Sequence, residues 1–388
     1  MRTAGWVRGM IVALVSLTAA AISGCAGFWD PLPNSGGTGN NPASGIFYVL
    51  NQKTSQVAGF SFASGSSSPT AVANSPYALP SQPQAIAISP NGSYLYISTL
   101  SGITYYTINS DGSLTSGSQA ISDDPATTMQ VDASGSWLVE CVSGSGVLNA
   151  IPISSSTGAS TGSTQTVTLP TGTLKQLAVS PSGGSATYVF VAMGSGGAAV
   201  VPFSAGNGNP FGTVQTVSTR HSLGGDNTVA VDPQNRLLYL GETAAVSGSQ
   251  TGGLRVFSIG SSAVTEISGS PYSTGGTGPS AILPMTSYVY VANTAVSGSS
   301  TGNITGFSLA ASGSTYSLTA INTVSAGPQT SGLAVDSTGA YLLAVNYGGN
   351  PDLSTFTFDS TTAGQLDAGP TSTTGTDPTG ALAIVAAQ

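Results

Sequence analysis

One stretch of this sequence combines a histidine, an arginine and two carboxylates. His221, the only histidine, follows Arg220, and two carboxylates come soon after it, Asp226 and Glu242. A histidine beside carboxylates acts as a general base, and an arginine holds a carboxylate or a developing oxyanion. The stretch is therefore a candidate catalytic cluster; the alternative is a solvated loop histidine beside an arginine.

A repeated apolar cluster indicates which elements position these residues. Its copies begin 43 to 53 residues apart. They start at Ile46, Tyr94, Trp137, Tyr188, Leu237, Tyr288 and Tyr341. Periods of this length are typical of propellers, solenoids and arrays.

Each copy after the first follows a second apolar run and a tight turn, as at 229–233 and 333–339. A third apolar run follows each copy, as at 103–108, and a weaker fourth run comes after it. Four strands per 40 to 50 residues is the period of a propeller blade. We therefore predict an all-β, seven-bladed β-propeller of four-stranded antiparallel blades; a β-sandwich is the alternative.

The two ends of the repeat array predict how the ring closes. The first copy lacks an inner strand before it, whereas the chain ends in an apolar run at 380–385 with no blade after it. If this C-terminal strand completes the first blade, the ring has seven blades and no open sheet edge.

Propeller geometry predicts one face for the candidate site. Residues just before an inner strand and just after a second strand share a face around the central channel, which we call the upper face. On it the ligand-binding candidates are Gln84, Asp226, Asn293, Asn346 and Tyr347. The fourth inner strand begins near Asp226, which also places Arg220, His221 and Glu242 there. Two similar polar loops, 243–252 and 294–302, are expected on this face in the fifth and sixth blades.

The repeat carries a family resemblance. Residues 288–293, 341–346 and the turn at 231–236 resemble the seven-bladed lactonase-type propellers. These include the 6-phosphogluconolactonase-like family and surface-layer propellers with Tyr-Val-Thr-Asn repeats. The resemblance covers roughly residues 45–388 and implies a lactone hydrolase in which His221 is the base, Glu242 orients it and Arg220 stabilises the oxyanion. The resembled enzymes carry more arginines and histidines at this face.

Composition excludes several partners. The net charge is −8, and only five Lys and Arg remain after residue 24, against 15 acids. Nucleic-acid binding needs a stripe of cations, so it is excluded. No cluster of His, Cys or carboxylates predicts a metal site, and no glycine-rich motif in a strand-to-helix context predicts a cofactor. We expect a monomer.

The N-terminus resembles a bacterial lipoprotein leader. Arg2 and Arg8 precede an apolar run, and small residues directly precede Cys25. The pattern predicts a signal peptide over 1–24, lipidation of Cys25 and a tether over 25–44 rich in Gly, Pro and Ser, before a propeller over 45–388. The alternative is an ordinary signal peptide with an incidental cysteine. Acylation would anchor an exported protein to the outer or cytoplasmic membrane, on the periplasmic side or at the surface.

Three functions fit these features. The scaffold is intact but poor in ionisable groups, which favours an envelope-anchored module that binds a small molecule, a glycan or a protein through the upper face and channel. The alternatives are a lactonase with a reduced active site and a structural propeller of the surface-layer type. Because one fold hosts many functions, the fold alone does not choose among them.

Overall fold

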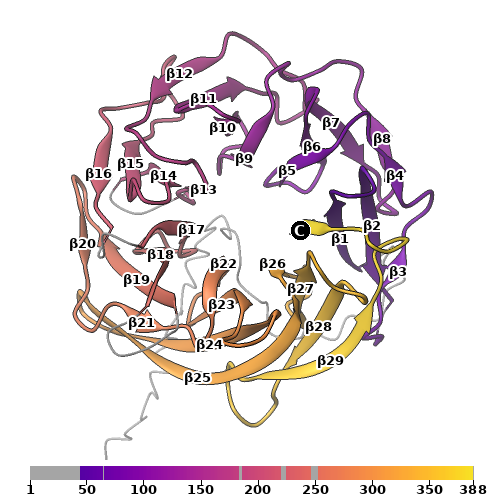
Figure 1. The fold of residues 1–388 in the computed structure, drawn as a ribbon. Helices are drawn as coiled ribbons and strands as arrows, with labels where there is room; N and C mark the ends of the chain where they lie inside the picture. Colours follow the sequence, from indigo (N-terminus) through magenta and orange to yellow (C-terminus); the bar gives the residue numbers. More distant parts are fainter. Residues whose placement is uncertain (1–43, 64, 183–185, 220–223, 246–251, 388) are drawn as a thin grey trace, which may run out of the picture.

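The computed structural model describes residues 44–63, 65–182, 186–219, 224–245 and 252–387. These residues form seven antiparallel sheets arranged as blades around a central channel (Figure 1). The described residues contain strands and turns, and no membrane-spanning helix is found among them. The predicted all-β propeller of seven blades is confirmed.

The blades follow one another in chain order, and the strands within each blade are named from the channel outward. The first blade contains β30 (Ala381–Ala386), β1 (Ser44–Asn51) and β2 (Gln56–Phe62), and both β3 (Thr70–Ala71) and β4 (Tyr77–Ala78) pair with β2. The second contains β5 (Pro83–Ile88), β6 (Tyr94–Thr99), β7 (Gly102–Ile108) and β8 (Leu114–Ser116). The third contains β9 (Ala126–Val131), β10 (Trp137–Val142), β11 (Val147–Pro152) and β12 (Gln165–Thr168). The fourth contains β13 (Gln176–Val179), β14 (Tyr188–Ala192), β15 (Ala198–Pro202) and β16 (Gln215–Val217).

The last three blades have the same order and somewhat longer strands. The fifth contains β17 (Asp226–Val231), β18 (Leu237–Ala245), β19 (Gly252–Ile259) and β20 (Val264–Glu266), and β21 (Tyr272–Ser273) also pairs with β19. The sixth contains β22 (Thr277–Pro284), β23 (Tyr288–Ala295), β24 (Thr301–Ser312) and β25 (Thr315–Pro328). The seventh contains β26 (Thr330–Val335), β27 (Tyr341–Asn346), β28 (Leu353–Phe358) and β29 (Leu366–Ser372).

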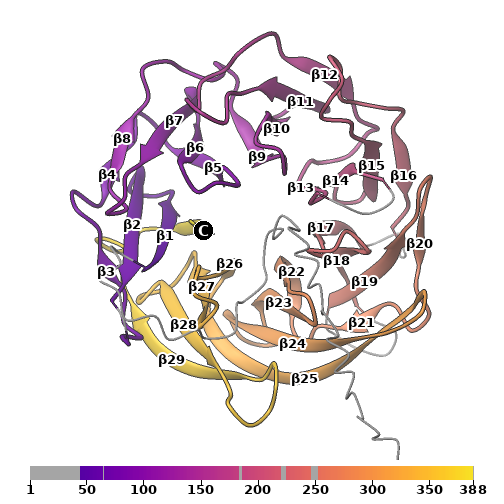
Figure 2. The same ribbon diagram turned by 180° about the vertical axis from the view of Figure 1, so that it is seen from behind.

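The ring closes through its C-terminal strand. β30 pairs antiparallel with β1, with Tyr48 opposite Val385 and Val49 opposite Ile384. In both views the C-terminus lies on the channel side of β1 (Figures 1 and 2). The predicted closure is therefore confirmed, and it leaves no blade without an inner strand.

Tyrosines of the second strands join neighbouring blades. The hydroxyl groups of Tyr48, Tyr96 and Tyr290 donate to the carbonyls of Gly112, Gly158 and Gly364, at 2.7, 3.0 and 2.8 Å. Each of these glycines lies in the outer hairpin of the next blade and has a positive φ. A Cβ atom on Gly158 would lie 2.5 Å from Tyr94 Cδ1, so the close approach requires glycine there.

The turns below the inner strands depend on buried acceptors. The carboxylate of Asp132 accepts hydrogen bonds from the backbone N–H groups of Ser136 and Trp137 at 2.8 and 2.7 Å. Asp336 and Asp232 accept from Tyr341 N and Leu237 N in the same way, at 2.7 and 2.9 Å. The repeated Asp of these turns therefore stabilises the turn, which agrees with the turn preference of Asp.

Candidate functional site: the central channel and the upper end of the fifth blade

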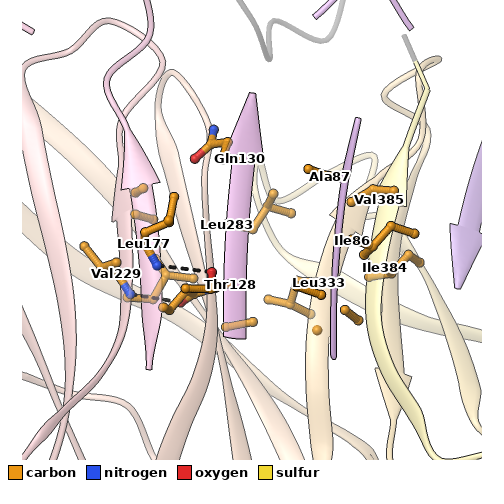
Figure 3. Close-up of a pocket in the computed structure, with 18 of the residues that line it drawn as sticks. Ile86, Ala87, Thr128, Gln130, Leu177, Val229, Leu283, Leu333, Ile384 and Val385 are labelled. Atoms are coloured by element: carbon orange, nitrogen blue, oxygen red, sulfur yellow. Dashed lines mark hydrogen bonds between the residues drawn. The ribbon is translucent and has the colours of Figure 1, made fainter. Parts of the chain in front are cut away.

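The central channel contains a cavity of about 650 Å³, lined by all seven inner strands. Figure 3 shows aliphatic side chains such as Leu177, Leu333 and Ile384 around it. The central level of the wall is formed by one apolar residue from each blade: Ile86, Met129, Leu177, Val229, Ile282, Leu333 and Ile384. The cavity is thus mainly hydrophobic at mid-depth.

Polar residues form a rim at the upper end of the cavity. This upper rim consists of Gln84, Thr127, Lys175, Asn227, Ser280 and Ser331, one from each of six blades. Tyr347 also lines the cavity, and its hydroxyl donates to Gln52 Oε1 at 2.9 Å. Lys53 Nζ lies 4.7 Å from the centre of the Tyr347 ring. An apolar cavity with a few polar groups at one end is typical of small-molecule sites.

Side chains from one inner strand bind the backbone of the next. Thr128 Oγ1 and Gln130 Oε1 accept hydrogen bonds from Leu177 N and Val179 N at 3.3 and 2.9 Å. Gln176 Oε1 accepts one from Val229 N at 3.0 Å. Because an inner strand has its free edge toward the channel, these contacts remove edge donors from the lumen on this side.

The structure separates the predicted ligand-binding residues into two groups. Gln84 and Tyr347 line the cavity, as expected for ligand contacts. Asn293 and Asn346 are fully buried, and each uses its amide within the protein. Asn293 Nδ2 donates to Thr274 O and Asn303 Oδ1 at 2.9 and 2.8 Å. The arrangement therefore favours a structural role for the two asparagines.

Asn346 shows the same use of its amide. Its Oδ1 accepts hydrogen bonds from Gly327 N and Thr330 Oγ1, both at 3.0 Å, and its Nδ2 donates to Ser354 Oγ at 3.1 Å. These contacts join β27 to β26 and β28, so they hold the upper end of the seventh blade together. Asn346 is fully buried, so its side chain is not accessible from the channel.

Two members of the predicted cluster are described, and both lie in the fifth blade of the closed ring, because the first blade takes its inner strand from the C-terminus. Asp226 begins β17 and pairs with Glu242 on β18. Both residues are buried, and neither lines the cavity. Arg220 and His221, the predicted oxyanion group and base, fall outside the described residues, as does Cys25.

The carboxyl group of Asp226 is fully buried, which is unusual for an ionisable group without a hydrogen-bond partner. Neither oxygen has a hydrogen-bond partner in the described part of the chain. Burial raises the pKa of Asp226 to about 7; Arg255 opposes this shift, while Glu242 and Glu266 add to it. Strongly shifted carboxyl groups are candidates for functional roles, although buried structural networks also produce them.

Two features at the seams between blades were missed from the sequence. Arg255 on β19 is buried, donates to Ser218 O at 2.9 Å and forms an ion pair with Glu266 at 3.1 Å. Glu140 on β10 is also fully buried; Asn149 Nδ2 donates to its Oε1 at 3.0 Å. The signal for Glu140 was a charged residue inside an otherwise apolar strand run.

The two polar loops differ from expectation in extent. β23 continues to Ala295 and β24 begins at Thr301, so much of the predicted loop 294–302 belongs to strands. A short turn joins them, in which Val296 N donates to Thr301 O at 2.9 Å. Of the loop 243–252, residues 246–251 lie outside the described residues.

The described residues contain no group of three or more His, Cys, Asp or Glu that could hold a metal ion. Asp123 and Asp124 are both exposed on the loop before β9. The donor set for a metal centre is therefore not present in this part of the chain.

Comparisons with known proteins agree with the fold. A family model described as lactonase, seven-bladed β-propeller, matches residues 40–180. A candidate 6-phosphogluconolactonase from Bacteroides fragilis superimposes with a TM-score of 0.71 at 13% identity, over 90% of this chain and 99% of that one. A second candidate, from Bacteroides uniformis, gives 0.68 at 14% identity, over 84% and 95%. A protein from Lactobacillus plantarum gives 0.61 at 16% identity, over 88% and 98%.

No curated protein matches this sequence. At these identities the structural likenesses show the fold alone, whereas the family model adds a sequence match over the first three blades. The chain is a lactonase-like seven-bladed β-propeller, and its resemblance to the lactonase-type propellers is confirmed.

Proposed function

We propose that this protein is an envelope-anchored binding propeller that holds a small ligand in its central channel. The observation that carries the proposal is the cavity of about 650 Å³ with its aliphatic wall and polar upper rim. This volume falls within the range of roughly 300–1,000 Å³ that is usual for small-molecule sites. The wall belongs to strands held in a closed ring, so the site is preformed and its ordering cost on binding is small.

The placement of the acids favours binding over hydrolysis. A general base must come within hydrogen-bond reach of the group that it deprotonates. Four described acids are buried near the upper face, and none of them lines the cavity: Asp226, Glu242, Glu140 and Asp352. Among the described residues that line the cavity, Lys175 is the only charged one.

Direct binding of a neutral, apolar fluorescent dye to the purified protein tests the proposal. The dye is expected to bind the purified protein with one site, and Leu333→Trp, which fills the cavity, should weaken binding roughly tenfold. Leu100→Trp is the matched control, because Leu100 is 59% exposed and lies outside the cavity. An absence of dye binding, or equal effects of the two variants, would contradict the proposal.

Anchoring by a lipid on Cys25 forms the second half of the proposal. The support is the leader pattern, in which basic residues and an apolar run precede small residues and a cysteine. Metabolic labelling with a radioactive fatty acid in a bacterial host is expected to label the protein, and Cys25→Ser should abolish the label. Label that persists in Cys25→Ser would exclude this site of acylation.

Lactone hydrolysis is a second candidate function, favoured by the family model that matches residues 40–180. In this alternative His221 is the base, Glu242 orients it and Arg220 stabilises the oxyanion. A screen of sugar and aliphatic lactones tests it, with His221→Ala alongside. Activity that disappears in the variant would support hydrolysis, whereas equal rates in both proteins would exclude His221 as the base.

A further inference from the structure

The upper rim has one charged residue, Lys175. Lys175 is exposed directly before β13 and lines the cavity. No ion pair joins it to another residue in the part of the chain that the structure describes. An ammonium group with three donors and no carboxylate nearby is a binding point for an anion.

Three other polar residues of the rim, Asn227, Ser280 and Ser331, use a side-chain donor within the protein. Asn227 Nδ2 donates to Pro279 O at 2.8 Å. Ser280 and Ser331 donate in the same way to Thr330 O and Ala381 O, both at 2.7 Å. Each bond joins one inner strand to the next, so these side chains hold the ring together. Lys175 is the one charged residue among the described residues that line the cavity, so it is the group of the rim that can attract a charged ligand.

The wall below Lys175 is apolar and has few free donors. Leu177 and Val179 follow Lys175 along β13, and Val229 and Val231 lie on the neighbouring strand β17. The edge N–H groups of Leu177, Val179 and Val229 are already bonded to side chains of the preceding strand. The dashed lines in Figure 3 mark such bonds beside Leu177 and Val229. An alkyl chain packed along this surface would cover no unpaired donor of these three residues, and burial of apolar area would favour it.

Acidic groups are kept away from this side of the cavity. Asp123 and Asp124 are exposed on the upper loop before β9, and neither lines the cavity. The carboxyl groups of Asp226 and Glu242 are buried within the seam of the fifth blade. From these placements we propose that the channel binds an amphiphilic carboxylate, with its head at Lys175 and an unbranched alkyl chain along β13 and β17. This inference rests on the proposed binding function and adds the chemical class of the ligand.

Matched ten-carbon ligands test the inference. Decanoate, decanol and decyltrimethylammonium share the alkyl chain and differ in the head group; each competes with the neutral dye below its micelle concentration. Decanoate is expected to displace the dye at a concentration roughly tenfold lower than decanol, and the cation should be the weakest, since the ammonium group of Lys175 attracts a carboxylate and repels a second cation. The preference should decrease as salt is added.

Two lysine variants locate the head group. Lys175→Gln is expected to remove the preference for decanoate over decanol, because the rim loses the charge that attracts a carboxylate. Lys53→Gln is the control, because Lys53 is a second exposed cation of the upper face that does not line the cavity. If the dye binds and decanoate equals decanol in the native protein, the carboxylate inference fails and the binding function stands. If the dye does not bind at all, the binding function itself fails. A preference lost in Lys53→Gln instead would overturn the assignment to Lys175.

Discussion

The upper end of the second strand carries Asn51 in the first blade and Glu242 in the fifth, at equivalent places in the sheet. Both ends of the Asn51 amide find a partner: its Nδ2 donates to Thr374 O at 3.1 Å, and its Oδ1 accepts from Thr374 Oγ1 at 2.9 Å. Asp352 completes this network, since it accepts from Thr374 N at 2.8 Å and from the hydroxyl of Thr379. Both the Asn51 amide and the Asp352 carboxylate in the closing seam are therefore hydrogen-bonded.

The fifth blade places ionisable groups where the first blade has neutral ones. The carboxyl group of Asp226 is buried beside Glu242 without a hydrogen bond to any described residue. Arg255, the cation that opposes the rise in its pKa, is paired with Glu266. Burying a carboxylate without a close partner destabilises the fold. Stability therefore explains the residues of the first blade better than those of the fifth, and local departures of this kind are typical of functional sites.

Removal of the closing strand gives the largest expected effect. Deletion of residues 381–388 takes β30 from the first blade and exposes the inner edge of β1. We expect loss of the cooperative thermal transition, an effect comparable to the whole stability of a domain, about 5–15 kcal/mol. Circular dichroism and gel filtration measure it.

A circular permutant is the control for this deletion. It joins residue 387 to residue 44 by a short glycine linker and opens the chain at Gly313, a hairpin glycine with no atom near its missing Cβ. It keeps β30 beside β1 and should melt cooperatively. A truncated protein that melts like the full chain would show that β30 is dispensable for closure.

Within the closing seam, Asp352→Ala should cost about 3 kcal/mol of unfolding free energy, because it leaves the buried backbone N–H of Thr374 and the buried hydroxyl of Thr379 without their acceptor. Chemical denaturation measures the change. Asp123→Ala is the control, since Asp123 is exposed, and it should change stability by less than about 0.5 kcal/mol. Equal effects of the two changes would mean that the network does not stabilise the seam.

The strand framework of both blades could be predicted from the sequence. Fully buried strands have continuous apolar runs bounded by turn residues, and six of the seven predicted runs begin where a strand begins, as at Tyr94 in β6 and Tyr288 in β23. The unpaired C-terminal run predicted closure because an open edge is unfavourable in a repeat array. These features depend on the local pattern of apolar residues and on the number of repeats in the chain.

The partners of polar side chains could not be predicted in this way. The amide of Asn293 is bonded to Thr274, nineteen positions earlier, and Gln176 accepts from Val229 N in the next blade. Such contacts depend on the register between blades, which no local pattern reports. The sequence therefore predicted the upper face, and only the structure separated the cavity-lining residues from the buried ones.

The pH dependence of stability tests the fifth blade. Since the pKa of Asp226 is raised to about 7 in the folded protein, both states hold the proton below about pH 4 and only the unfolded state releases it between there and about pH 7. The unfolding free energy should fall over this interval, by on the order of 3 kcal/mol, and stay level above it. Asp226→Asn should remove this part of the slope and stabilise the protein at pH 8.

Denaturation curves between pH 4 and pH 8 measure the slope, with Asp123→Asn as the control that should leave it unchanged. If the slope of Asp226→Asn matches that of the native protein, the carboxyl group titrates normally. The fifth blade would then resemble the first, with its acid fully stabilised by neighbouring groups.

Glu140 offers a smaller version of the same test in the third blade. Burial raises its pKa to about 7, the hydrogen bond from Asn149 opposes the shift, and Asp124 adds to it. Because Asn149 already donates to one oxygen, ionisation should cost less than at Asp226, and Glu140→Gln should increase stability above pH 7 by about 1 kcal/mol. Its amide keeps the acceptor for Asn149, so the comparison isolates the charge. A loss of stability in Glu140→Gln at pH 8 would show that the charged carboxylate is favourable in this seam, and burial alone would then not explain the acids of either blade.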